Sequence, residues 1–293
     1  MSWWKDLKCI VRRNEPLNRH TTFRIGGPAR FYIEPYDVAD LKLLINALKR
    51  YKITPLVIGA GSNILVHDRG VDAAVVVLSS DYFTRLSVTK HALEAGAGCS
   101  LRRVTDAAVA HGLSGVEFLA GIPGTVGGAL TMNAGAWGSD MSGIAKAVTV
   151  MDYRGRLKTL ARKDVRFGYR ASSLARYIVI GAQFSLKTAQ RTVIKSRIAR
   201  FRALRKKTQD TAYPCAGSVF VNPRGYSAGA LIDACGLKGA RVGGACISTR
   251  HANFIVNQHH AKASDVLQLL ALAQREVKKK FKVRLEPEIK IWK

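Results

Sequence analysis

The sequence predicts an α+β protein with more than one domain, and three observations support this. The chain has 293 residues, of which 47% are hydrophobic, enough for cores in two or three domains. Residues 21–78 alternate between strand-like runs and one helical run, whereas residues 86–186 are dominated by glycine around short strands. From about residue 192 onward the chain is rich in helical patterns and strongly basic.

The N-terminal third contains a strand, a helix and two further strands. Residues 31–35 form a short strand-like run that ends at a proline. Either Asp37 or Asp40 can then cap an amphipathic helix, whose apolar positions are Leu41, Leu44, Ile45 and Leu48. Residues 56–58 and 73–78 are apolar runs typical of buried strands. Strand, helix and strand at these lengths predict a β-α-β unit with parallel pairing.

The later elements are read from the same signals. Residues 148–151 and 178–180 are short strands within the glycine-rich stretch, and residues 194–204 belong to a helix. A second helix runs from Ser264, the expected N-cap, through Val277. Residues 284–291 are strand-like at the C-terminal end.

The formal charge of +27 indicates a strongly basic surface. It suits an anionic partner, which could be nucleic acid, a membrane surface or a phosphorylated small molecule, or it is a general property of the surface. The five cysteines form no C-x-x-C pair, which favours reduced, mostly buried thiols and no zinc site. Residues 1–10 lack the apolar core of a signal peptide, and no run approaches the roughly 20 apolar residues of a membrane span. We therefore expect a soluble, cytoplasmic protein without metal.

A first glycine loop directly follows the strand at residues 56–58. Its residues are Gly59, Ala60, Gly61, Ser62 and Asn63. Glycines allow a tight turn whose successive N–H groups point into one concavity suited to a pyrophosphate. The third glycine of the Rossmann fingerprint is replaced by Ile64, and no Walker lysine follows. A simple strand-to-turn connection would show the same pattern.

A second, longer glycine-rich segment covers residues 121–138. Its run of glycine and alanine is costly in backbone entropy, which favours close approach of a ligand to the main chain, although a close-packed glycine helix is the alternative. Two such segments in one chain favour a long ligand with a diphosphate, and FAD has that shape.

Several motifs are spread in order along the chain. They are residues 21–27 (TTFRIGG), the Gly59 loop, and residues 115–128 (GVEFLAGIPGTVGG), 167–173 (FGYRASS), 216–220 (AGSVF), 251–254 (HANF) and 285–288 (LEPE). Together they resemble the family of UDP-N-acetylenolpyruvoylglucosamine reductases. The chain has no room for the insertion that carries a tyrosine loop in longer members, so it resembles the shorter class.

The resemblance implies an α+β architecture built on an FAD-binding fold of the vanillyl-alcohol oxidase type. Two α+β subdomains would hold FAD, at residues 1–85 and 86–190, and residues 191–284 would form a C-terminal α+β substrate domain. The C-terminal strand, residues 285–293, would return to the first subdomain. In the family NADPH reduces the flavin, which then passes a hydride to the enolpyruvyl ether of UDP-N-acetylglucosamine, giving UDP-N-acetylmuramate for peptidoglycan.

The resemblance assigns three catalytic residues. Arg170 would stabilise charge that builds toward the substrate carboxylate, and Ser218 would deliver the proton, which requires positive neighbours and accurate placement. Glu288 would polarise the substrate, most simply as a carboxyl whose pKa is raised enough to make it a donor. Without the resemblance to the family, Arg170 would be interpreted as a surface arginine, Ser218 as part of a turn and Glu288 as a glutamate at the end of a strand.

The same resemblance implies binding residues. For the substrate they are Tyr169 and Asn222; for FAD they are Gly59, Ala60, Gly61, Ser62, Asn63, Gly121, Pro123, Gly124, Thr125, Gly128 and Asn133.

The chain departs from the family pattern near these residues. Val221 stands where a lysine normally precedes Asn-Pro, and Arg224 is nearby. Asp210 replaces a proline, and Thr249-Arg250 replaces an acidic-basic pair. These changes bear on substrate affinity.

Three other functions are compatible with parts of the sequence. A nucleic-acid-binding protein would use the basic residues Lys195, Arg197, Arg200, Arg202, Arg205, Lys206, Lys207 and Lys278 to Lys280. Few aromatic side chains accompany them, so we expect small-molecule partners and neither nucleic acid nor membrane. A flavin oxidase or dehydrogenase acting on another substrate and an inactive flavin-binding homologue are the remaining alternatives.

Overall fold

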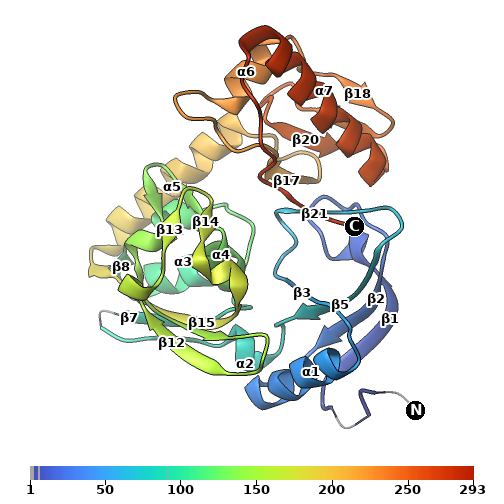
Figure 1. The fold of residues 1–293 in the computed structure, drawn as a ribbon. Coiled ribbons are helices and arrows are strands. Elements are labelled where there is room, and N and C mark those ends of the chain that lie inside the picture. The colour runs from blue at the N-terminus through green and yellow to red at the C-terminus, as the bar shows by residue number, and fades with distance from the viewer. Residues whose placement is uncertain (1–2, 6, 91) are drawn as a thin grey trace. The chain divides into compact units, whose positions relative to one another are not determined.

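The computed structural model describes residues 3–5, 7–90 and 92–293 (Figure 1). It divides into two compact units, and the chain passes between them several times. Unit 1 consists of the N-terminal segment up to Arg13, Phe31–Gly59 and Ala73–Leu204; unit 2 consists of Asn14–Arg30, Ala60–Asp72 and Arg205–Lys293. The described residues mix helices and strands throughout, as an α+β protein should.

A four-stranded sheet with the order β1-β2-β5-β3 lies mostly in unit 1. Its strands are β1 (Ile10–Pro16), β2 (Pro28–Glu34), β3 (Pro55–Ile58) and β5 (Val71–Val77). The helix α1 (Val38–Arg50) connects β2 to β3. The predicted strands and helix are present, and β3 pairs in parallel with β5. Because β5 stands between β2 and β3 in the sheet, the two strands that α1 connects are not neighbours.

Helix α1 is capped by Asp37, which settles the two alternatives. The Asp37 carboxylate accepts a hydrogen bond from the N–H of Asp40 at 2.8 Å. Asp40 itself is buried and accepts from the N–H groups of Lys8 and Tyr36. The predicted apolar positions form the buried stripe of α1.

A five-stranded antiparallel sheet with the order β12-β11-β15-β7-β6 follows in unit 1. Its strands are β6 (Leu86–Val88), β7 (Ala92–Gly96), β11 (Ala145–Met151), β12 (Leu157–Ala161) and β15 (Ile178–Ser185). The helices of this region are α2 (Asp81–Thr84), α3 (Leu101–Ala110) and α4 (Val126–Thr131). Helix α4 packs on β15 (Figure 1). One continuous core joins this sheet to α1 and β2, so residues on both sides of position 85 share a core.

Three two-stranded sheets complete unit 1. They are β8 (Leu113–Ser114) with β16 (Lys187–Thr188), β9 (Gly135–Ala136) with β10 (Ser139–Asp140), and β13 (Phe167–Gly168) with β14 (Ala171–Ser172). There are also short 3-10 helices. η1 (Leu17–Arg19) lies in unit 2, and η2 (Glu117–Leu119), η3 (Met141–Gly143), η4 (Arg162–Asp164) and η5 (Ser173–Arg176) lie in unit 1.

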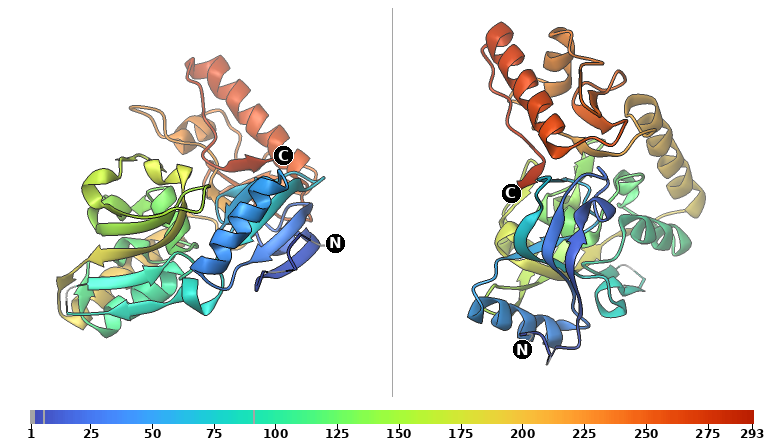
Figure 2. Two further views of the ribbon diagram at one scale, coloured as in Figure 1. Left: turned by 60° about the horizontal axis from the view of Figure 1, so that its bottom comes forward. Right: turned by 90° about the vertical axis from the view of Figure 1, so that its right-hand side faces the viewer.

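Unit 2 is built on a four-stranded antiparallel sheet with the order β17-β20-β19-β18. Its strands are β17 (Cys215–Ser218), β18 (Arg241–Val242), β19 (Ala245–Ile247) and β20 (Phe254–Asn257). Helix α7 (Ala263–Phe281) packs on β18 and β19, and α6 (Ala228–Ala234) packs on α7. The C-terminal strand β21 (Lys290–Trp292) pairs in parallel with β4 (Ile64–Val66). The red C-terminal end thus returns to the N-terminal third of the chain in both views of Figure 2.

The start of α7 differs from the prediction. The helix begins at Ala263, so Ser264 lies inside it and is not the N-cap. The carboxylate of Asp68 accepts hydrogen bonds from the N–H groups of Ala263 and Ser264, at 2.7 and 3.1 Å. A residue almost 200 positions away therefore satisfies the free donors of the first turn.

The predicted basic helix is α5 (Arg191–Thr208), which carries no acidic residue. Ile194 and Ile198 are its buried side chains, packed with Ala120 of unit 1. In the described part of the chain, no helix is long and apolar enough to cross a bilayer. All five cysteines are free thiols; Cys99 and Cys246 are buried and the others partly so.

Candidate active site

Two glycines of the first loop make close contacts with other parts of the chain. A Cβ atom added to Gly59 would lie 2.4 Å from Oγ1 of Thr125, so this glycine allows the end of β3 to pack against Thr125 within unit 1. Gly61 has a φ of +63°, and a Cβ there would lie 2.2 Å from the carbonyl oxygen of His20. Both positions therefore need glycine for steric reasons of the fold itself.

Asn63 ends this loop next to the C-terminal strand. Its Nδ2 donates to the carbonyl oxygen of Glu288 at 3.2 Å, and its own carbonyl accepts from the N–H of Lys290 at 2.9 Å. The side chain of this predicted FAD residue thus holds the backbone of a predicted catalytic residue, both within unit 2.

The second glycine segment is mostly not helical, which argues against a close-packed glycine helix. Only the short α4 is helical, and the Thr125 side chain caps it by accepting from the N–H of Gly128 at 3.4 Å. In the first turn of α4, the N–H groups of Val126 and Gly127 donate to the carbonyl oxygens of Cys99 and Ala97. A Cβ on Gly127 would come within 3.0 Å of the Ala97 Cβ, so this glycine allows close packing.

Asn133 is a buried junction in this segment. It has a φ of +43°, and its Nδ2 donates to the carboxylate of Asp140 and to the carbonyl oxygen of Gly168, at 3.1 and 3.0 Å. Its Oδ1 accepts from the N–H of Ser142 at 3.0 Å. The amide therefore holds protein groups together, among them the hairpin β13–β14.

Arg170 lies in the two-residue loop of that hairpin, after Tyr169. It has a φ of +56°, a conformation that costs a non-glycine residue about 1–2 kcal/mol. Nη1 of Arg170 donates to the carbonyl oxygen of Gly135 at 2.9 Å, and the guanidinium lies 5.3 Å from the centre of the Tyr169 ring. The Ser172 hydroxyl adds a bond to the carbonyl of Thr131 at 2.9 Å. The glycine-rich segment thus fixes the hairpin that carries Arg170.

Ser218 and Glu288 come together in unit 2. Ser218 ends β17, opposite Phe254 of β20, after a bulge that contains Gly217 with a φ of +74°. Beyond Ser218, the carbonyl oxygen of Val219 accepts from the N–H of Glu288 at 2.8 Å. The two predicted catalytic residues are thereby on neighbouring extended segments, whereas Arg170 belongs to unit 1.

The TTFRIGG stretch supports the same region of unit 2. The Thr22 hydroxyl donates to the carbonyl oxygen of Cys215 at 2.7 Å, and the Thr22 N–H donates to Gly61 at 3.2 Å. Asn257 at the end of β20 donates to the carbonyl of Phe23 at 3.1 Å. Segments that are 193 and 234 residues apart in the sequence therefore meet around β17.

The predicted substrate residues are both exposed. The side chain of Tyr169 is 59% exposed in its hairpin loop. The Oδ1 of Asn222 accepts from the N–H of Ala228 at 2.9 Å, so this residue helps to start α6.

The departures from the family pattern have structural uses. The Asp210 carboxylate accepts from the Ser248 hydroxyl at 2.9 Å, and Nη1 of Arg250 donates to the carbonyl oxygen of Lys206 at 3.1 Å. Together they tie residues 248–251 to the C-terminal end of α5. The N–H of Val221 donates to the carbonyl of Glu286 at 2.9 Å, a bond that does not depend on its side chain.

Comparison with known proteins gives consistent results. A model of the C-terminal domain of UDP-N-acetylenolpyruvoylglucosamine reductase matches residues 209–292, and an FAD binding domain matches residues 29–161. UDP-N-acetylenolpyruvoylglucosamine reductase 2 of Symbiobacterium thermophilum is 42% identical over 284 residues, covering 96% of this chain and 92% of that protein. The corresponding reductase of Caldanaerobacter subterraneus is 43% identical over 280 residues, covering 95% and 92%.

The crystal structure of the reductase from Thermus caldophilus has a TM-score of 0.83 with this chain. Its sequence is 36% identical, and the match covers 98% of this chain and 100% of the other. The chain belongs to the UDP-N-acetylenolpyruvoylglucosamine reductase family. As a member of this reductase family it is an FAD-dependent oxidoreductase, and the family's reaction belongs to peptidoglycan precursor synthesis.

Each of the two glycine segments of this reductase family member has backbone donors of the kind that suit a phosphate group. Among the hydrogen bonds formed by the described residues, none is donated by the N–H groups of Ala60, Gly61, Ser62, Gly124 or Thr125. Unused backbone donors in glycine-rich turns are the groups that bind phosphate oxygens. The described residues contain no group of three His, Cys, Asp or Glu side chains able to hold a metal ion.

Three supporting residues are not singled out by the sequence. Asn253 and His251 belong to the HANF motif, and Glu117 belongs to the motif at residues 115–128. Glu117 is buried and accepts from the Ser114 hydroxyl and the Gly115 N–H, both at 2.6 Å, with Arg197 of α5 at 3.5 Å. Burial acts to raise the pKa of Glu117, but these hydrogen bonds and the Arg197 charge outweigh it, so the pKa is lowered. A polar residue beside apolar residues within a motif is the sequence signal that could have identified all three.

Proposed function

We propose that this chain reduces UDP-N-acetylglucosamine enolpyruvate to UDP-N-acetylmuramate, with NADPH as hydride donor. The observation that carries the proposal is the pairing of the Ser218 and Glu288 segments, joined by the 2.8 Å bond between Val219 and Glu288. This pairing lies within residues 209–292, which match the family's C-terminal domain.

FAD would be held by backbone donors of the two glycine segments. The residues concerned are Gly59, Ala60, Gly61, Ser62, Asn63, Gly121, Pro123, Gly124, Thr125, Gly128 and Asn133; among them, the side chains of Asn63 and Asn133 act by keeping the loops in place. When bound, FAD supplies the hydride for the terminal carbon of the alkene, having taken it from NADPH.

Arg170 stabilises the negative charge that develops on the substrate. Hydride addition at the terminal carbon drives electron density from the alkene toward the carboxylate, and a guanidinium is a fixed cation suited to that position. Its bond to the Gly135 carbonyl orients the side chain before substrate binds.

Ser218 donates the proton that completes the reduction. The carbon next to the carboxylate receives this proton from the serine hydroxyl, so one hydride and one proton saturate the double bond. A hydroxyl is a weak acid, and its contribution depends on accurate placement. Gly217 and the bulge in β17 set the direction in which Ser218 leaves the sheet.

Glu288 completes the site as a hydrogen-bond donor to the substrate carboxylate in its protonated form. A pH–rate profile that is unchanged in Glu288→Gln would exclude this role. Tyr169 and Asn222 are proposed to contact the substrate, and its UDP and the NADPH phosphates suit the basic surface. We propose a cytoplasmic protein whose partners are these small molecules, not nucleic acid or membrane.

Anaerobic mixing tests the function in two stages. Purified protein with FAD is mixed with NADPH and then with the enolpyruvyl sugar nucleotide, while flavin absorbance is followed. We expect bleaching in the first stage and return of the yellow colour in the second. In Ser218→Ala the first stage should be unchanged and the second slowed by about 100-fold or more. Wild-type protein that is not reoxidised by the sugar nucleotide would contradict the proposal.

A further inference from the structure

We infer that Asn253 is a positioning residue that places Ser218 through the backbone of Val219 and Phe220. The inference rests on the proposed function, because it takes Ser218 as the proton donor. Asn253 itself lies in the loop before β20, in unit 2, and its side chain is 3% exposed.

The Asn253 amide binds both polar groups of one backbone residue. Its Oδ1 accepts from the N–H of Phe220 at 3.0 Å, and its Nδ2 donates to the carbonyl oxygen of Phe220 at 2.8 Å. The main-chain carbonyl of Asn253 also accepts from the N–H of Val219 at 2.9 Å. Three hydrogen bonds from one residue thus hold the two positions that follow Ser218.

These bonds continue the hydrogen bonding of the segment beyond the point where the pairing of β17 with β20 ends. Regular pairing of β17 with β20 is interrupted by the bulge and ends at Ser218 opposite Phe254. Phe220 is 1% exposed, so its N–H and carbonyl need protein partners. Asn253 supplies them where no further strand residue does.

The opposite edge of the same segment carries Glu288. The carbonyl of Val219 accepts from Glu288, the N–H of Val221 donates to Glu286, and Phe220 faces Pro287 across an antiparallel bridge. The segment is therefore held between Asn253 on one side and the glutamate strand on the other. A change at Asn253 should shift Ser218 relative to Glu288.

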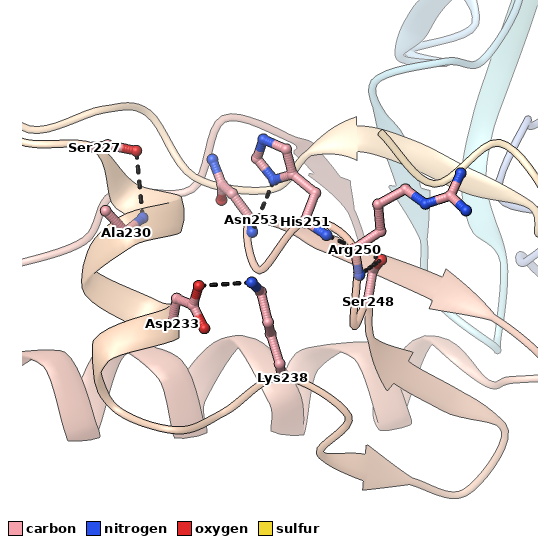
Figure 3. Close-up of polar contacts among 8 residues, drawn as sticks. All are labelled: Ser227, Ala230, Asp233, Lys238, Ser248, Arg250, His251 and Asn253. Carbon is pink, nitrogen blue, oxygen red and sulfur yellow. Dashed lines mark hydrogen bonds and ion pairs between the residues drawn. The ribbon is translucent and has the colours of Figure 1, made fainter. Parts of the chain in front are cut away.

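Asn253 is itself held by a small network (Figure 3). Its N–H donates to Nδ1 of His251 at 3.2 Å, and the N–H of His251 donates to the Ser248 hydroxyl at 3.3 Å. That hydroxyl donates to Asp210. These hydrogen bonds therefore hold residues 248–253 in one conformation.

Asn253→Asp tests the inference with little change in size. The aspartate lacks the Nδ2 donor and places an oxygen against the Phe220 carbonyl. NADPH-dependent flavin bleaching should be unchanged, whereas reoxidation by the enolpyruvyl substrate should slow by roughly 10- to 100-fold, because sub-ångström displacement of a reacting group has effects of that size. The solvent deuterium isotope effect on reoxidation should rise, because proton delivery becomes slower.

A double variant separates positioning from a general structural role. If Asn253 acts through Ser218, adding Asn253→Asp to Ser218→Ala should slow reoxidation by less than about threefold further. Multiplicative losses in the double variant, or equal slowing of bleaching and reoxidation in the single variant, would overturn the inference. Asn253→Gln, which keeps the amide and lengthens the side chain, is measured by the same two criteria if the aspartate variant does not fold.

Asn257→Asp is the matched control. Asn257 is also a buried asparagine, at the end of β20, and it bonds to Phe23 and Ala261. We expect it to lower stability without raising the isotope effect on reoxidation. Failure of the wild-type protein to be reoxidised would count against the proposed function, whereas an intact wild type with additive variants would count against Asn253 alone.

Discussion

Two buried asparagines support the predicted catalytic residues, one in each unit, and they do so differently. Asn133 of unit 1 bonds to Gly168, Asp140 and Ser142, and so fixes a hairpin with an exposed loop. Asn253 of unit 2 bonds to both backbone groups of a residue that is 1% exposed. Asn133 thus supports the backbone that carries a long arginine side chain, whereas Asn253 supports the backbone next to a short serine side chain.

The length of a side chain decides how well it tolerates a shift of its backbone. A long arginine side chain can compensate for a small backbone shift by changing its rotamers, whereas a serine hydroxyl is displaced together with its backbone. We therefore expect catalysis to be more sensitive to backbone shifts in the Asn253 region than in the Asn133 region.

The largest effect is expected for Arg170→Lys in unit 1. A lysine ammonium is a single point charge that cannot both bind the Gly135 carbonyl and present a planar fork to a carboxylate, so kcat should fall by about 100-fold or more. Steady-state kinetics with the enolpyruvyl substrate measures this. Arg176→Lys is the control, since Arg176 is exposed and lies over the Tyr177 ring of the same unit. Equal kcat values in the two variants would show that Arg170 has no special role.

Loss of stability should be larger for Asn253→Ala than for Asn133→Gly. Asn253→Ala leaves the buried N–H and carbonyl of Phe220 without partners, which should lower the free energy of unfolding by about 2–5 kcal/mol. At Asn133, glycine suits the φ of +43°, Gly168 is exposed to water, and Ser142 keeps its bond to Asp140, so the loss should be about 1–2 kcal/mol. Urea unfolding measures both. A greater loss at Asn133 would reverse the comparison.

Acid should weaken the Asn253 region before the region around Glu117. Burial lowers the pKa of His251, and the Lys238 charge lowers it further, against an opposing backbone hydrogen bond. A lowered histidine pKa means that the unfolded chain binds the proton first. The stability contribution is therefore complete above pH 6.5 and is lost as the pH falls through the folded pKa. The lowered pKa of Glu117 gives a contribution that is complete above pH 4.5 and is lost only below it.

Unfolding free energies measured from pH 8 to pH 3.5 should separate the two groups. His251→Gln should flatten the decline that begins near pH 6.5, and Glu117→Gln should flatten the decline below pH 4.5. If His251→Gln leaves the upper decline unchanged, another group is responsible for it.

The smallest effect is expected for Arg250→Ala. Its bond to the Lys206 carbonyl is at the exposed end of α5, so its removal should lower the free energy of unfolding by less than about 1 kcal/mol. Arg241→Ala, at an exposed position of β18, is the control. A loss as large as that of Asn253→Ala would mean that the 248–251 tether is as important as the Asn253 amide.

Local sequence patterns are sufficient to predict the helices and strands and the residue types of the site. The apolar spacing of α1, the apolar runs of β3 and β5 and the Ser218 and Glu288 motifs are all local patterns, because periodicity and turn chemistry act over a few residues. The motifs in order also indicated the family that the comparisons establish.

Which distant residues act together depends on the tertiary fold. Asp68 rather than Ser264 caps α7, β5 enters between β2 and β3, and Asn253 binds the residues after Ser218. Each of these contacts joins positions that are 19 or more residues apart, and local sequence carries no signal for them. They follow from the need of every buried N–H and carbonyl group for a partner, which is met by whichever polar group the fold brings near.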